Sequence, residues 1–180
     1  MNRGLFSTAL LILALRSGCS SPPPLATVAA VDLPRFMGDW YVIASIPTFL
    51  EVGAHNPVES YRLDTDGTID TTFSFNADGF DGEKKTYHPR GFVRNRQTNA
   101  VWGMQFIWPI KADYRIVYLD EQYQYTIIGR NKLDYLWIMA RQPIIDETVY
   151  GDLVARAERL GYLANLIVRS PHATPERGQR

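Results

Sequence analysis

Between residues 40 and 141 the chain reads as short β-prone runs separated by turns, and no long helical period interrupts them. Runs of this length at regular spacing are typical of an up-and-down barrel or a sandwich. Without strand–helix alternation, a Rossmann or hydrolase fold is excluded. Eight candidate strands can be drawn, at 40–46, 59–64, 68–75, 85–93, 100–107, 114–119, 123–129 and 135–141.

The connections between these runs alternate in character. Every second one is a short polar turn (64–67, 95–99, 120–122), whereas the others (47–57, 76–84, 108–113, 130–134) are on average longer and carry apolar residues. An antiparallel meander puts the first set at one end and the second at the other, which a Greek-key sandwich would not do. We therefore predict an all-β fold, an eight-stranded up-and-down antiparallel β-barrel, whose open mouth is lined by Phe49, Phe80 and Trp108.

After the last predicted barrel strand, the sequence favours one helix. Asp146 is a suitable N-cap and Gly161 a suitable terminator. An apolar stripe recurs at helical spacing between them and predicts a C-terminal α-helix packed on the barrel wall: Val149, Leu153, Ala157 and Leu160. Residues 166–168 suggest a short extra strand on the barrel edge, and we expect residues 171–180 to form a flexible tail.

The N-terminus has the features of a lipoprotein signal peptide over residues 1–18. Its apolar run, 5–15, is too short to span a bilayer. Small residues precede Cys19, as in a bacterial lipobox, whose cysteine is diacylated and anchors the protein. Arg16 stands where a lipobox usually has leucine, so an ordinary secretory signal with Cys19 left as a free thiol is the alternative.

Ser20, rather than aspartate, follows the cysteine, which resembles lipoproteins sent to the bacterial outer membrane. We therefore expect a lipid-anchored outer-membrane protein. Residues 19–30 form the lipidated cysteine and a proline-rich tether, and residues 31–170 form the folded domain.

Composition excludes several function classes. Lysine plus arginine equals aspartate plus glutamate at 19 each, so no basic footprint for nucleic acid exists. A single cysteine excludes an intramolecular disulfide, and three scattered histidines argue against a metal site. No nucleophile elbow, zinc-protease motif, P-loop or dinucleotide turn occurs. We expect a protein that is not an enzyme and holds no cofactor and no metal.

Three separated motifs resemble the signatures of the lipocalin family. They are Gly38-Asp39-Trp40 before the first strand, the turn that begins at Asp120, and residues 136–141, which end in Arg141. Together with the lipobox, the chain resembles a bacterial outer-membrane lipocalin of the kind similar to apolipoprotein D. The resemblance implies that Gly38, Trp40, Asp120 and Arg141 are structural, with Arg141 lying over the indole of Trp40 and its spare donors satisfying carbonyls of residues 33–37.

Alternation along the strands predicts the barrel interior, because polar residues mark the outer face. The predicted lipid-binding cavity consists of Ile69, Phe73, Phe75, Trp102, Met104, Phe106, Tyr114, Ile116, Tyr118, Tyr135, Trp137 and Met139. These side chains could either fill a small barrel or surround one small pocket. We favour the pocket, since barrel mouths are common ligand sites.

A pocket of this kind suits the acyl chain of a fatty acid or a lysophospholipid. Candidate partners for an anionic head group are Arg90, Lys111, Arg130 and Lys132. Glu59 shares the parity of Tyr61, and an inward, unpaired carboxylate there would instead favour a cationic or zwitterionic head group. The alternative function is an interaction protein with a filled barrel that uses its apolar mouth to form a homodimer or bind a partner.

Overall fold

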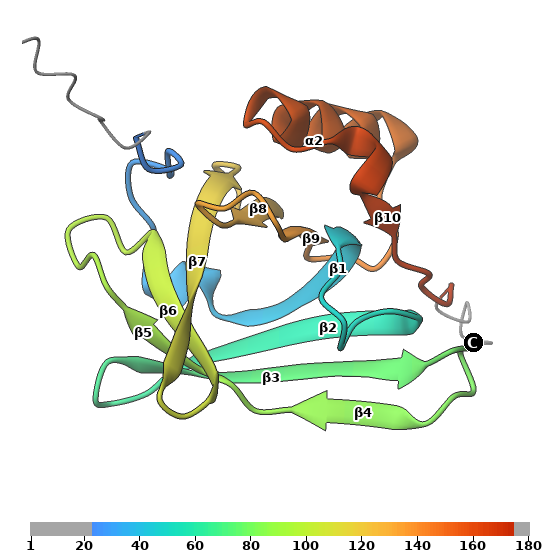
Figure 1. Cartoon of the computed structure of the whole chain (residues 1–180), viewed down its shortest axis with the longest axis horizontal. Helices are drawn as coiled ribbons and strands as arrows, with labels where there is room; N and C mark the ends of the chain where they lie inside the picture. The colour runs from blue at the N-terminus through green and yellow to red at the C-terminus, as the bar shows by residue number, and fades with distance from the viewer. Residues whose placement is uncertain (1–22, 175–180) are drawn as a thin grey trace, which may run out of the picture.

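The computed structural model describes residues 23–174, which form a closed β-barrel with one long helix outside it (Figure 1). The barrel closes because β1 (Gly38–Ile46) pairs with β9 (Leu136–Ala140). Between them, strands that follow one another along the chain pair antiparallel, except that β4 and β5 both pair with β3 and not with each other. These strands are β2 (Ala54–Leu63), β3 (Thr68–Ala77), β4 (Lys84–Tyr87), β5 (Arg90–Val93), β6 (Val101–Ile107), β7 (Ile110–Leu119) and β8 (Tyr125–Gly129). The predicted eight-stranded up-and-down barrel is confirmed.

One predicted strand, at 85–93, is divided into β4 and β5. Both pieces pair with β3, but only β5 pairs with β6. The interruption falls at His88 and Pro89, where proline has no N–H to give to a ladder. Beyond that break, β4 makes no pairing with β6 within the described part of the chain.

Two predicted mouth connections are shorter than expected. β2 begins at Ala54, because a bulge between His55 and Val58 accommodates Pro57 within the strand. β7 begins at Ile110, which pairs with Ile107 across a turn of only Trp108 and Pro109. The tip of the β6–β7 hairpin is therefore an unbroken run of apolar residues.

The closed end of the barrel is held by Trp40 and Arg141. The guanidinium carbon of Arg141 lies 3.9 Å from the centre of the Trp40 ring. Its terminal nitrogens donate at 2.8–3.1 Å to the backbone carbonyls of Arg35, Phe36, Met37 and Asp39. Two of these carbonyls belong to the short helix α1 (Leu33–Phe36), which starts from the cap residue Asp32, and a third belongs to its C-cap, Met37. The pairing predicted from the sequence signatures is present.

The other signature residues meet at the same end. Gly38 has φ +92°, a conformation that glycine adopts without strain, and lies beside Arg141. The carboxylate of Asp120 accepts backbone N–H groups of residues 122, 124 and 125, which fixes the β7–β8 turn. Arg141 also donates from Nε to the carbonyl of Tyr123 at 3.3 Å. The residues of all three signatures therefore lie together and close one end of the barrel.

Outside the barrel, α2 (Glu147–Arg159) covers β1, β8 and β9 (Figure 1). Asp146 caps it by accepting the N–H of Thr148 at 2.7 Å, and Leu153 and Ala157 are buried against the wall. The edge strand is β10 (Val168–Arg169), which pairs with β1 and begins two residues later than predicted, because η1 (Ala164–Leu166) precedes it. Among the described residues, no helix is long and apolar enough to cross a membrane.

The segments flanking the barrel are fixed to it. The N–H of Val28 donates to Ile116 on β7 at 3.0 Å, and that of Val31 donates to Thr98 at 2.7 Å. Part of the sequence predicted as a tether therefore lies along the wall. In the predicted tail, residues 171–173 are also held, with the His172 ring bonded to the carbonyl of Val42 at 2.9 Å. Cys19, the signal sequence, the start of the tether and residues 175–180 lie outside the described residues.

Candidate ligand cavity

A cavity of about 250 Å³ lies inside the barrel between β2, β3, β6, β7 and β9, and the loop after β1 covers part of it. Its walls are mainly aromatic and aliphatic, with a few carboxylates and one guanidinium. The lining residues are Thr48, Phe49, Leu50, Glu51, Glu59, Tyr61, Phe73, Met104, Phe106, Ile107, Ala112, Asp113, Tyr114, Arg130, Tyr135, Trp137 and Met139.

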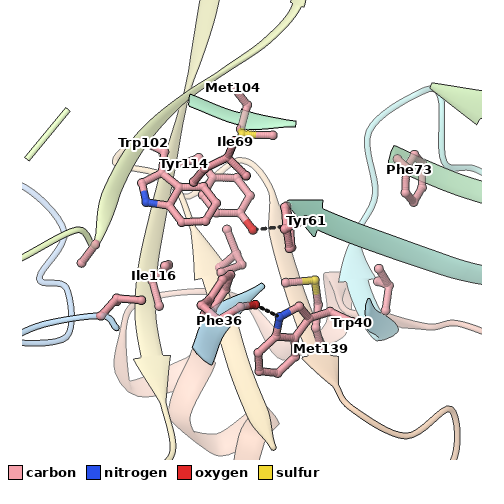
Figure 2. Close-up of a cluster of buried hydrophobic side chains, with 14 of the residues drawn as sticks. Phe36, Trp40, Tyr61, Ile69, Phe73, Trp102, Met104, Tyr114, Ile116 and Met139 are labelled. Carbon is pink, nitrogen blue, oxygen red and sulfur yellow. Dashed lines mark hydrogen bonds between the residues drawn. The ribbon is translucent and has the colours of Figure 1, made fainter. Parts of the chain in front are cut away.

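The predicted cavity residues fall into three groups. Seven of them line the cavity: Phe73, Met104, Phe106, Tyr114, Tyr135, Trp137 and Met139. Four others are buried in the interior cluster without lining it, and Figure 2 shows Ile69, Trp102 and Ile116 there, with Phe75 as the fourth. The barrel is therefore partly filled by its own side chains and partly hollow.

Tyr118 is the third group, and its predicted inward position is wrong. A bulge on β7 between Ile116 and Tyr118 breaks the strict alternation from which the position was predicted. Tyr118 packs in the cluster under α2, where the guanidinium of Arg156 lies 4.4 Å from its ring centre.

The predicted mouth residues are also divided. Phe49 is 84% exposed and lines the cavity entrance. Phe80 instead stacks edge-on with His55 at 5.0 Å, and Trp108, 83% exposed, stands at the tip of the β6–β7 hairpin. Phe80 and Trp108 therefore do not line the cavity.

Glu59 is the most unusual side chain in the cavity. It is 8% exposed, and its Oε2 has no hydrogen-bond partner among the described residues. Burial, and secondarily the charge of Glu51, raise the pKa of Glu59 from 4.5 to about 8. The inward orientation inferred from the parity of Glu59 and Tyr61 is present. At neutral pH, Glu59 in the unliganded cavity therefore holds a proton.

Glu51 is the second carboxylate of the cavity. Its Oε1 accepts the indole N–H of Trp137 at 2.7 Å, and its Oε2 accepts the N–H of Thr48 at 2.6 Å. Burial raises its pKa, while these donors act in the opposite direction. Sequence reasoning missed Glu51 because it lies in a loop whose inward fold depends on its contact with Trp137.

The polar lining also includes a pair of hydrogen-bonded phenols and one cation. The hydroxyls of Tyr61 and Tyr114 hydrogen-bond at 2.6 Å (Figure 2), and burial raises both of their pKa values. Nε of Arg130 lies 3.4 Å from the Asp134 carboxylate, and its guanidinium lies 5.1 Å from the centre of the Tyr135 ring.

The other candidate head-group cations lie elsewhere. Arg90 bonds Thr68 and the Asp64 carboxylate on the outer face. Lys111 lies over the ring of Phe92 at 3.4 Å, and Lys132 is exposed. Within the described chain, Arg130 is therefore the one predicted cation that lines the cavity.

Comparison with known proteins places the barrel in a family. The sequence model of the lipocalin-like domain matches residues 31–172. The chain belongs to the lipocalin-like family. This lipocalin is 29% identical over 160 residues to the outer membrane lipoprotein Blc of Escherichia coli K12, with 87% of each chain covered.

Two further relatives show how widely the same architecture occurs. Temperature-induced lipocalin-1 of Arabidopsis thaliana is 30% identical over 155 residues, with 83% of each chain covered. The solved structure of insecticyanin from the tobacco hornworm Manduca sexta matches the lipocalin with a TM-score of 0.66 at 16% identity and 86% coverage of each chain. This last likeness establishes the fold alone.

Proposed function

We propose that this lipocalin is a membrane-tethered lipid-binding protein, anchored in the bacterial outer membrane through acylated Cys19. It holds or transfers single-chain lipids, fatty acids or lysophospholipids, for storage, transport or maintenance of the envelope. The observation that carries the proposal is the hollow part of the barrel, lined by Phe73, Met104, Tyr114 and Met139. The similarity to an outer membrane lipoprotein supports the location.

The size of the cavity favours one acyl chain over two. Its volume of about 250 Å³ lies just below the usual range of small-molecule pockets, about 300–1,000 Å³. Apolar walls gain roughly 0.8 kcal/mol for each methylene that leaves water. A single chain can therefore bind usefully while its head group stays at the mouth or meets the polar lining.

Blocking the cavity tests this proposal. Ala112 lines the cavity from β7, opposite Met104 across the β6–β7 ladder, so Ala112→Trp should fill the hollow. We expect native mass spectrometry of the delipidated wild type to retain added laurate or a single-chain lysophospholipid, and the variant to lose at least about tenfold in affinity. Ala29→Trp, at an exposed position outside the cavity, is the matched control. Equal lipid retention by Ala112→Trp and wild type would contradict the proposal.

A second candidate function is self-association through the hairpin tip. Ile107, Trp108 and Ile110 are 69–83% exposed in one short turn, which is an unusual apolar surface for a monomer. If the tip forms a dimer interface, Trp108→Ser should shift the sedimentation coefficient from dimer to monomer at micromolar concentration. A wild type that sediments as a monomer would remove this candidate without affecting lipid binding.

A further inference from the structure

The charges of the cavity wall do not match an anionic ligand. Its lining holds the carboxylates of Glu51, Glu59 and Asp113 against a single guanidinium, that of Arg130. Asp113 is paired with Arg115 at 3.0 Å, and Arg130 with Asp134 at 3.4 Å, so these two charges are compensated locally, although Nε of Arg130 makes no hydrogen bond within the described chain. The lining groups that have no counter-charge when ionised are the two glutamates.

The two glutamates differ in how many hydrogen bonds their side-chain oxygens accept. Glu51 receives two N–H donors, from Trp137 and Thr48, which stabilise its ionised form. Glu59 has an oxygen without a hydrogen-bond partner in the described part of the chain and lies close enough to Glu51 for the two carboxyl groups to interact. A buried carboxyl with free acceptor capacity needs a donor, and beside another carboxyl it ionises only when a cation lies against it.

Within residues 23–174, no group facing Glu59 supplies that cation. The titratable groups around it are Glu51 from the β1–β2 loop, Tyr61 on β2 and Tyr114 on β7. Both tyrosines direct their hydroxyls at each other, 2.6 Å apart (Figure 2). The cation of the lining, Arg130, lies against Asp134, and Arg141 donates to the carbonyls of the closed end. The missing partner must come from the ligand.

We infer that the cavity recognises an ammonium group, and that its ligands are single-chain amphiphiles bearing a primary amine, with the ammonium at Glu59 and Glu51. This inference rests on the proposed lipid-binding function and gives that function a head-group preference. On binding, the ligand ammonium replaces the proton of Glu59, which leaves to solvent, so that one cation is exchanged for another. A fatty-acid carboxylate would instead meet the carboxyl groups of Glu51 and Glu59.

A matched ligand series tests the inference. Decylamine, decanol and decanoate share one chain length and differ only in the head group, and each is titrated calorimetrically into the delipidated full chain near pH 7. We expect decylamine to bind at least about tenfold more tightly than decanoate, with decanol between them. Titrations in two buffers of different ionisation enthalpy should show release of close to one proton per decylamine bound, and none for decanol.

The decisive variant is Glu59→Gln, which keeps the shape and removes the charge. We expect it to lower decylamine affinity by about tenfold to hundredfold, the range for a lost hydrogen bond between charged partners, and to abolish proton release. Decanol affinity should change less than about twofold. Glu158→Gln, exposed on α2, is the matched control and should leave every ligand unchanged. Proton release by the wild type remains a readout if the variant folds poorly.

The outcomes separate this inference from the proposed function. If all three ligands bind equally and Glu59→Gln has no effect, the lipid-binding function stands and the ammonium preference is wrong. Tighter binding of decanoate would also overturn the preference, since protonated Glu59 would then be acting as a donor to an anion. If none of the three ligands binds, both proposals fail.

Discussion

At the scale of single residues, the two ends of the barrel interior satisfy charged side chains in opposite ways. Arg141 at the closed end donates to five backbone carbonyls, whereas Oε2 of Glu59 in the cavity has no hydrogen-bond partner among the residues that the structure describes. A charge with all its hydrogen bonds made contributes to stability, and a buried one without them costs free energy. The closed end is therefore built for stability, and the cavity retains a residue that stability alone would not select.

Trp40 should matter for stability and not for ligand binding. Trp40→Phe removes the indole donor that meets the Phe36 carbonyl at 2.8 Å, so the free energy of unfolding should fall by about 1–2 kcal/mol. Trp40 is absent from the cavity lining, so laurate affinity of the folded fraction should stay unchanged. Urea unfolding and calorimetry measure the two quantities. Lost affinity at unchanged stability would contradict this division of roles.

Glu59 should make stability depend on pH. Because its folded pKa of about 8 exceeds the ordinary 4.5, the native state binds the proton more tightly. The contribution is complete below about pH 4.5 and is lost as pH rises through about 8, by at most roughly 5 kcal/mol. Urea unfolding at about pH 5, 7 and 9 should show this decline in the wild type. Glu59→Gln should flatten it, and an equal slope in both proteins would refute the assignment.

Several residue roles followed from the sequence, and others could not. The contact between Trp40 and Arg141 was implied by the resemblance to the lipocalin signatures, and it agrees with the closure of an eight-stranded meander, which brings the last strand back beside the first. Tyr118 was misplaced because a bulge changes side-chain parity without leaving a sequence signal. The role of Glu51 depends on a loop folding toward Trp137, a tertiary contact that no local pattern encodes.

At the scale of elements, strand number, order and the helix were predictable, because period-2 runs, polar turns and a capped apolar stripe are local features. The residues at which the strands begin and end were less predictable. β2 starts earlier than predicted because pairing with β3 extends through Pro57 by a bulge. The predicted tether also gave no local sign that it binds β7, since its hydrogen bonds are made by backbone groups.

Removing that bound segment should destabilise the barrel. A chain that starts at residue 32 loses the bonds from Val28 to Ile116 and from Val31 to Thr98, and loses the buried Val31 side chain. Each of the two bonds contributes about 1 kcal/mol and the valine about 1.5–3, so the free energy of unfolding should fall by roughly 3.5–5 kcal/mol. A chain that starts at residue 23 is the control. Equal melting temperatures of the two chains would show that the segment contacts the barrel wall without stabilising the fold.

At the scale of the whole molecule, the proposed anchor decides where the lipocalin is found. Two or more acyl chains hold a protein stably in a bilayer. Cys19→Ala should therefore move most of the protein from the outer-membrane fraction to the soluble periplasmic fraction, as measured by density-gradient fractionation and immunoblotting. The barrel itself should be unchanged, since its first strand begins at Gly38. Retention in the membrane at wild-type abundance would argue against acylation.

The packing of Leu25 and Val28 against the barrel also limits how far the barrel can lie from the membrane that holds the proposed anchor. Only residues 19–24 separate the proposed anchor from the first residue held on the wall, Leu25, whose N–H bonds Asn131 at 2.8 Å. Six residues span at most about 20 Å when fully extended. A lipocalin held this close to the membrane would bind and release its ligand within the leaflet that anchors it. It would therefore move lipid along one membrane and not between two membranes.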